Sequence, residues 1–211
     1  MNQTEKREPL RLISQVVSIL FHPVFMPLYG LLIIFFAPTI FIYIPGNIKR
    51  VLFMLVLINM MVVPLAMLPL FRYRNIISSY SLTDAGERVM PLALGLLMYI
   101  LTTIIFFSYQ IPALIKSFIL AASVVVFILL MVTLIWKISI HSAGMGGLLA
   151  TVMALSVRMG APLTVWLAAL ILLSGVVMAS RLYLGAHKPG QVYWGFLTGF
   201  VPFMIILLFL G

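Results

Sequence analysis

The stretch that says most about the architecture is residues 180–195, SRLYLGAHKPGQVYWG. It places Arg181 and His187 between two apolar stretches, residues 162–180 and 190–210. Crossing a bilayer takes about 20 apolar residues, and each flanking stretch is long enough to do so. Ionisable side chains at membrane depth are costly, so their presence between two spans indicates a functional site.

The composition as a whole is that of a membrane protein. Of the 211 residues, 64% are hydrophobic and only 8% are charged, and the mean hydropathy is +1.24. These values exclude a soluble domain of this size, which needs a largely polar surface. The apolar runs are long and lack strand-period alternation, which argues against a transmembrane barrel. We therefore predict an all-α fold, a polytopic transmembrane helical bundle of about six to seven spans.

Seven segments have the length and apolarity of a span: residues 16–36, 51–71, 90–108, 114–136, 142–158, 162–180 and 190–210. The first is too long for the core of a signal peptide and is interpreted as a retained span. Pro23 and Pro27 near its start predict a kink or a re-entrant opening. No linker or internal repeat divides the chain, so we expect one integral membrane domain over residues 1–211.

Counting spans places three polar clusters on one side of the membrane. Two spans separate the loop at residues 72–88 from residues 137–141, and two more separate the latter from residues 181–187. A site composed of several loops requires this arrangement.

The second cluster, residues 136–147, reads WKISIHSAGMGG and opens a new span. The amides of a helix start favour an anion, and glycines allow it to approach. Each cluster also has a purely structural interpretation. Ser139 and His141 suit a helix cap at the interface, Arg181 suits snorkelling to the headgroups, and the glycines suit close helix packing.

Taken together, the second and third clusters resemble signatures of the type 2 phosphatidic acid phosphatase (PAP2) superfamily. The family's third signature is Ser-Arg, five residues, His, three residues, Asp. Its second is Pro-Ser-Gly-His, often continued by Ser/Thr-Ala-Gly. The matching residues are Ser180, Arg181 and His187 for the third signature, and Ser139, His141, Ser142, Ala143 and Gly144 for the second. The departures are Gln191 in place of Asp, and Ile138 and Ile140 in place of Pro and Gly.

The family's first signature, Lys, six residues, Arg-Pro, has a looser counterpart. Arg88 and Pro91 supply the arginine and the proline, and Ser81 stands where the family has lysine. The resemblance thus covers a phosphatase-like core at about residues 84–200.

The resemblance implies a lipid phosphatase that uses neither metal nor other cofactor. Its substrate would be a phosphorylated membrane lipid of the phosphatidic acid, polyprenyl diphosphate or lipid A class. His187 would attack phosphorus to form a phosphohistidine, and His141 would protonate the leaving oxygen and then activate water. The residues expected to bind the phosphate are Arg181, Ser139, Ser180, Arg88 and Lys137.

Gln191 leaves a second function open. Glutamine can accept the Nδ1 proton of His187, but it cannot supply the charge of the family's carboxylate. The alternative is therefore a catalytically weak or inactive relative that binds or moves a phosphorylated lipid. Asp84 or Glu87 is a candidate to replace the missing charge.

The remaining features restrict partners and location. The net charge of +9 is spread over juxtamembrane loops, which favours a membrane surface over nucleic acid. The absence of cysteine excludes disulfides and thiolate chemistry. We expect an integral protein of a bacterial inner membrane. The positive-inside rule places the clusters in the cytoplasm, whereas the resemblance implies the outer face. The sequence does not define the oligomeric state.

Overall fold

The computed structural model describes residues 3–80 and 86–211, with side chains of the first helix from Glu8 onward. The protein is 83% helical, and the described residues contain no strand. Seven helical stretches are long and apolar enough to cross a membrane, which confirms the predicted all-α transmembrane bundle. The main helices are α1 (Gln3–Leu20), α2 (Met26–Phe36), α3 (Gly46–Val56), α4 (Val63–Tyr73), α5 (Val89–Ser108), α6 (Ala113–Thr133), α7 (Ile140–Met159), α8 (Thr164–Tyr183) and α9 (Pro189–Leu210).

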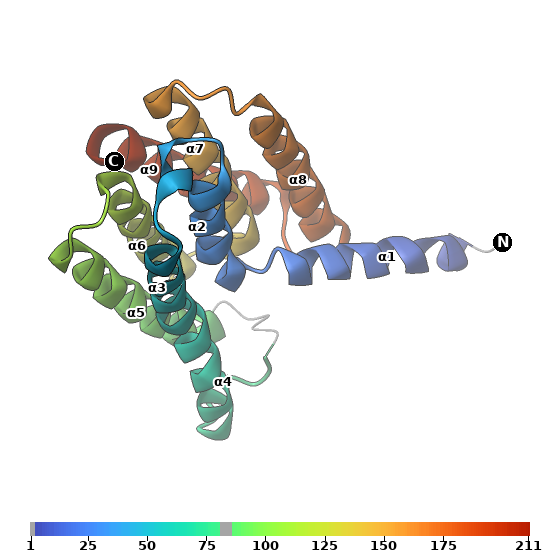
Figure 1. Ribbon diagram of the computed structural model, residues 1–211. Coiled ribbons are helices and arrows are strands. Elements are labelled where there is room, and N and C mark those ends of the chain that lie inside the picture. Colours follow the sequence, from blue (N-terminus) through green and yellow to red (C-terminus); the bar gives the residue numbers. More distant parts are fainter. Residues whose placement is uncertain (1–2, 81–85) are drawn as a thin grey trace.

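The first predicted span is broken where its prolines occur. Helix α1 ends at Leu20, and His22 caps a short 3₁₀ turn, Pro23–Phe25, before α2 begins. Proline has no N–H to donate and fixes its own φ, so a helix is readily interrupted there. Helix α1 packs on α8 and extends away from the bundle, whereas α2 enters it (Figure 1).

A long helical stretch follows α2 on the outside of the bundle. Helices α3 and α4 are joined by a π-helical segment, Leu57–Val62, and Pro64 is the second residue after it. A π-helical turn shifts the hydrogen-bond register and often accompanies a functional site. Helix α4 packs on α5, and several side chains of the stretch face the cavity described below.

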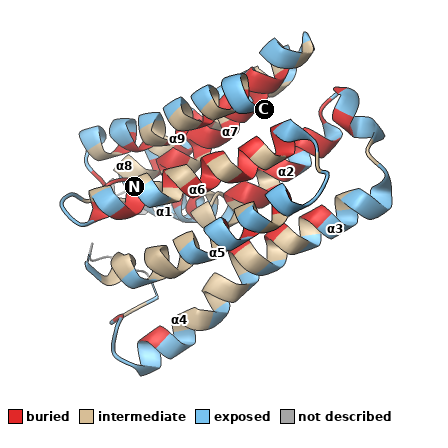
Figure 2. Ribbon diagram, turned by 90° about the vertical axis from the view of Figure 1, so that its left-hand side faces the viewer, coloured by how far each residue is buried: buried red, intermediate tan, exposed pale blue. Residues whose placement is uncertain are grey.

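Helix α7 is at the centre of the fold and is the most buried of the seven stretches (Figure 2). It packs chiefly on α9. A methyl group at Gly199 of α9 would overlap the carbonyl oxygen of Ala143, and one at Gly146 of α7 would overlap that of Phe196. Helices that approach this closely in a membrane need small residues at the contact, because lipid tails provide no hydrophobic drive for association.

We expect Gly199→Ala to destabilise the bundle by about 2 kcal/mol or more, because the Ala143 carbonyl cannot yield without a shift of α7. Gly175→Ala in α8 is the matched control. Nothing lies within 4 Å of its added methyl group, so it should be neutral or stabilising by about 1 kcal/mol. Unfolding in mild detergent measures both, and equal stabilities would contradict the close α7–α9 contact.

Candidate active site

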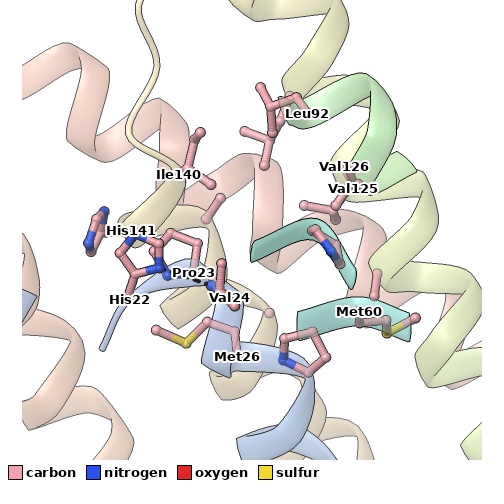
Figure 3. A pocket seen from close by; sticks show the side chains of 18 of the residues that line it. His22, Pro23, Val24, Met26, Met60, Leu92, Val125, Val126, Ile140 and His141 are labelled. Atoms are coloured by element: carbon pink, nitrogen blue, oxygen red, sulfur yellow. Dashed lines mark hydrogen bonds between the residues drawn. The ribbon is translucent and has the colours of Figure 1, made fainter. Parts of the chain in front are cut away.

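Side chains from all three polar clusters line one cavity of about 390 Å³, part of which is shown in Figure 3. Its polar lining includes Arg88 at the start of α5, His141 at the start of α7, Arg181 in the last turn of α8, and His187 in the loop before α9. The structure therefore brings together four of the residues singled out in the sequence. His22, at the break between α1 and α2, lines the same cavity.

A tight turn and a helix start position His187. Gly185 has φ +64° after the end of α8, a conformation that glycine adopts without strain. His187 is only 7% exposed, and its Nδ1 lies 3.3 Å from Oε1 of Gln191. That oxygen also accepts the backbone N–H of Lys188 at 3.0 Å. Because an amide oxygen only accepts, Nδ1 carries the proton and Nε2 keeps a lone pair.

The surroundings of His187 favour its neutral form. Burial lowers the pKa of His187 to about 4, and the charges of Arg181 and Arg88 add to this effect. The hydrogen bond to Gln191 acts in the opposite direction, and Lys137 makes a smaller lowering contribution. At neutral pH the imidazole is therefore uncharged and nucleophilic at Nε2.

The start of α7 is linked to the start of α9. Ser139 caps α7, and its hydroxyl oxygen accepts hydrogen bonds from the amide and the hydroxyl of Ser142 at 3.4 and 2.9 Å. The backbone N–H of Ser139 donates to the carbonyl of Gln191 at 3.1 Å. Ser139 is completely buried and is absent from the cavity lining.

The two other expected phosphate ligands are Ser180 and Lys137. Ser180 donates to the carbonyl of Val176 within α8 at 2.8 Å, and Lys137 acts on His187 through its charge. Neither side chain lines the cavity.

The sequence reasoning missed Ser18 of α1. Its hydroxyl oxygen accepts a hydrogen bond from Nη1 of Arg181 at 3.1 Å, and its carbonyl oxygen lies 3.1 Å from Nε2 of His141. Because a carbonyl only accepts, Nε2 of His141 carries a proton and Nδ1 is the nitrogen left for chemistry. Arg181 Nε is buried and has no hydrogen-bond partner among the described residues, which leaves a donor for an anion. Nothing in the sequence around Ser18 predicts its hydrogen bond with Arg181, 163 positions later.

Of the two acidic residues considered as substitutes for the missing carboxylate, only Glu87 is among the described residues. Asp84, like Ser81, is outside the described residues. One oxygen of Glu87 accepts the N–H of Ser78 at 2.7 Å, which holds it in the preceding loop. Within residues 3–80 and 86–211, no group of three or more His, Asp or Glu side chains is arranged to hold a metal ion.

Residues 132–211 match the PAP2 superfamily. The match confirms the resemblance seen in the sequence over the last turn of α6 and all of α7, α8 and α9. Searches of curated proteins and of solved structures found no significant match. The PAP2 segment contains His141, Arg181, His187 and Gln191. Arg88 and the α1–α2 contribution to the cavity lie outside it.

We expect Gln191→Asp to raise the pKa of His187 above its value of about 4, because a carboxylate at the Nδ1 proton favours the imidazolium. Gln191→Leu removes the hydrogen bond without adding charge and should lower the pKa further. Histidine NMR titration of the protein in micelles measures both. Equal values for the two variants would show that residue 191 does not contact the ring.

Proposed function

We propose that this protein is an integral membrane phosphatase of the PAP2 type that releases phosphate from a lipid phosphate or diphosphate. The observation that carries the proposal is the composition of the cavity. Histidine and arginine side chains line one end, where they suit a phosphate group, and apolar side chains line the remainder, where they suit a hydrocarbon chain. The match to the PAP2 superfamily supports phosphatase-type activity.

In the first step, Nε2 of His187 attacks phosphorus. The new N–P bond forms as the bond to the lipid oxygen breaks, and the leaving oxygen takes the proton that Nδ1 of His141 acquires when the phosphate anion binds. The Ser18 carbonyl holds the opposite nitrogen of His141 and so keeps Nδ1 free for this transfer. Gln191 holds the Nδ1 proton of His187 throughout.

In the second step, water attacks the phosphohistidine. The N–P bond breaks and returns its electron pair to His187, the hydroxyl becomes part of the released phosphate, and the water proton passes to Nδ1 of His141. The cycle therefore consumes one water and leaves both histidines as they began. Neither step needs a metal.

The cationic side chains stabilise the charge on the transferring phosphoryl group. Arg181 and Arg88 line the cavity and are suited to bind the equatorial oxygens directly. Lys137 does not line the cavity and contributes through its charge. Ser139 and Ser180 are buried in helix contacts. Their contribution is to hold the starts and ends of α7 and α8 in position.

The apolar part of the cavity supports a lipid substrate. It is lined from several helices by Met26, Met60, Leu92, Tyr99, Val125, Val126 and Phe203, among others. Phe203 lies fourteen residues beyond Pro189, about 20 Å along the axis of α9, and its ring meets Phe118 edge-on at 5.5 Å between centroids. A chain bound there would run from His187 toward this aromatic pair.

Gln191 supports a second candidate function. An amide cannot stabilise the charged imidazole as the family's carboxylate does, so the same cavity would also suit a relative that binds or moves a phosphorylated lipid. For either function we propose one membrane domain over residues 1–211 with the phosphatase core at about 84–200, located in a bacterial inner membrane.

The decisive measurement is phosphate release by the purified protein in EDTA. We expect release from dioctanoyl phosphatidate or farnesyl diphosphate, loss of activity in His187→Ala by about three orders of magnitude or more, and acid-labile labelling at His187. Arg158→Gln is the control, because Arg158 lies at the far end of α7 and binds the carbonyls of Leu207 and Leu208. Phosphate binding without release, in both the wild type and His187→Ala, would favour the second function.

Val126→Trp tests the hydrocarbon chain in the cavity. The larger side chain should occlude the apolar part (Figure 3) and lower kcat/KM for long-chain lipid phosphates about tenfold or more. Hydrolysis of p-nitrophenyl phosphate, which has no chain, should be little changed. An equal loss for both substrates would place the lipid chain outside this cavity.

A further inference from the structure

His22 is a third histidine of the cavity and belongs to no PAP2 signature. It lies about 110 residues before the segment that matches the superfamily. Its ring packs edge-to-face against His141, with 5.3 Å between centroids and an interplanar angle of 85°. The side chain is exposed and lines the same cavity as Arg181 and His187. Figure 3 shows it beside His141.

One hydrogen bond determines which nitrogen of His22 carries the proton. Nδ1 accepts the backbone N–H of Val24 at 3.4 Å, as the cap of the 3₁₀ turn. An N–H only donates, so Nδ1 must present its lone pair and Nε2 must carry the hydrogen. The neutral ring therefore offers a donor at Nε2.

The cavity around His22 is built for an anion. Arg88, Arg181, His141 and His187 line it, and no Asp or Glu of the described residues does. Hydrogen bonds from a neutral donor to a charged acceptor are stronger than those between neutral groups. A neutral imidazole also adds a donor without adding to the repulsion between the two arginines.

We propose that His22 donates its Nε2 hydrogen to a non-bridging oxygen of the bound phosphate, as a further residue of the catalytic site. The ligand rests on the proposed function, but the role differs from those of the two signature histidines. His187 attacks through Nε2 and His141 transfers protons through Nδ1, whereas His22 binds and orients the group being transferred. The break between α1 and α2 brings this donor to the cavity, since it ends α1 and places residue 22 beside the start of α7.

Two variants separate donation from capping. In His22→Asn the shorter amide retains a capping oxygen in place of Nδ1 but has no donor at the Nε2 position. In His22→Gln the amide nitrogen reaches the Nε2 position. Phe25→Ala is the matched control, because the Phe25 ring also packs against His22, at 6.4 Å, but does not line the cavity.

The assay measures the Kd of inorganic phosphate by calorimetry and kcat/KM for dioctanoyl phosphatidate, both on the full-length protein in micelles. We expect His22→Asn to raise the Kd about tenfold or more, the effect of losing one hydrogen bond to a charged group, and to lower kcat/KM at least as much. His22→Gln should stay within about threefold of the wild type, and Phe25→Ala should match it. Unchanged phosphate binding in His22→Asn, or equal losses in the Asn and Gln variants, would overturn the proposal.

One further measurement and one comparison of outcomes keep the test decisive. If His22→Asn does not fold, ¹⁵N-histidine NMR of the wild type should show that the Nε2–H of His22, assigned by its absence in His22→Gln, shifts on addition of phosphate and is retained in Phe25→Ala. An Nε2–H of His22 that does not respond to phosphate would overturn the proposal. If phosphate binding depends on residue 22 but the wild type releases no phosphate from any lipid, the proposed function fails and the role of His22 stands. If phosphate release requires His187 but is unaffected by His22→Asn, the proposed function stands and the role of His22 fails.

Discussion

The backbone contact between α7 and α9 is the constraint on which the site depends. Gly199 lies against the carbonyl of Ala143, and the N–H of Ser139 donates to the carbonyl of Gln191. The two helices are thus joined at their starts and along their sides. His141 is the second residue of α7, and His187 lies just before α9, so this contact places the proposed acid–base and the proposed nucleophile beside the same cavity.

Concentrating positive charge at the end of a membrane bundle has an energetic cost. Arg88 and Arg181 line one cavity, no described acidic residue joins them there, and their charges together with burial lower the pKa of His187 to about 4. A phosphate with two negative charges relieves this repulsion when it binds. The same interactions that keep His187 neutral in the empty cavity therefore favour the anion that it is proposed to attack.

Much of this arrangement is visible in the sequence because it follows from local rules. Long apolar stretches predict the spans, and counting them brings Arg88, His141 and His187 to one side. The contacts of Ser18 are not predictable in this way, because they join α1 to residues more than 120 positions away. His22 stands out in the sequence as an ionisable residue before a proline inside an apolar stretch. Its contact with His141 was not predictable, because that contact depends on how α2 packs on α7.

Gln191 bears differently on the two properties expected of the site, phosphate binding and phosphoryl transfer. Its oxygen keeps the hydrogen bonds to His187 and to the Lys188 amide, so the tautomer and the start of α9 do not require a carboxylate. The charge that would develop on the imidazole in the proposed phosphoryl transfer does call for a carboxylate. In a serine protease, a comparable change from Asp to Asn costs about 10⁴ in rate. That loss reflects both a wrong tautomer and a missing charge, whereas here the tautomer is retained. For the proposed reaction, the amide therefore preserves the geometry of His187 and weakens only its electrostatic support, so we expect phosphate binding to depend less on residue 191 than the rate of transfer does.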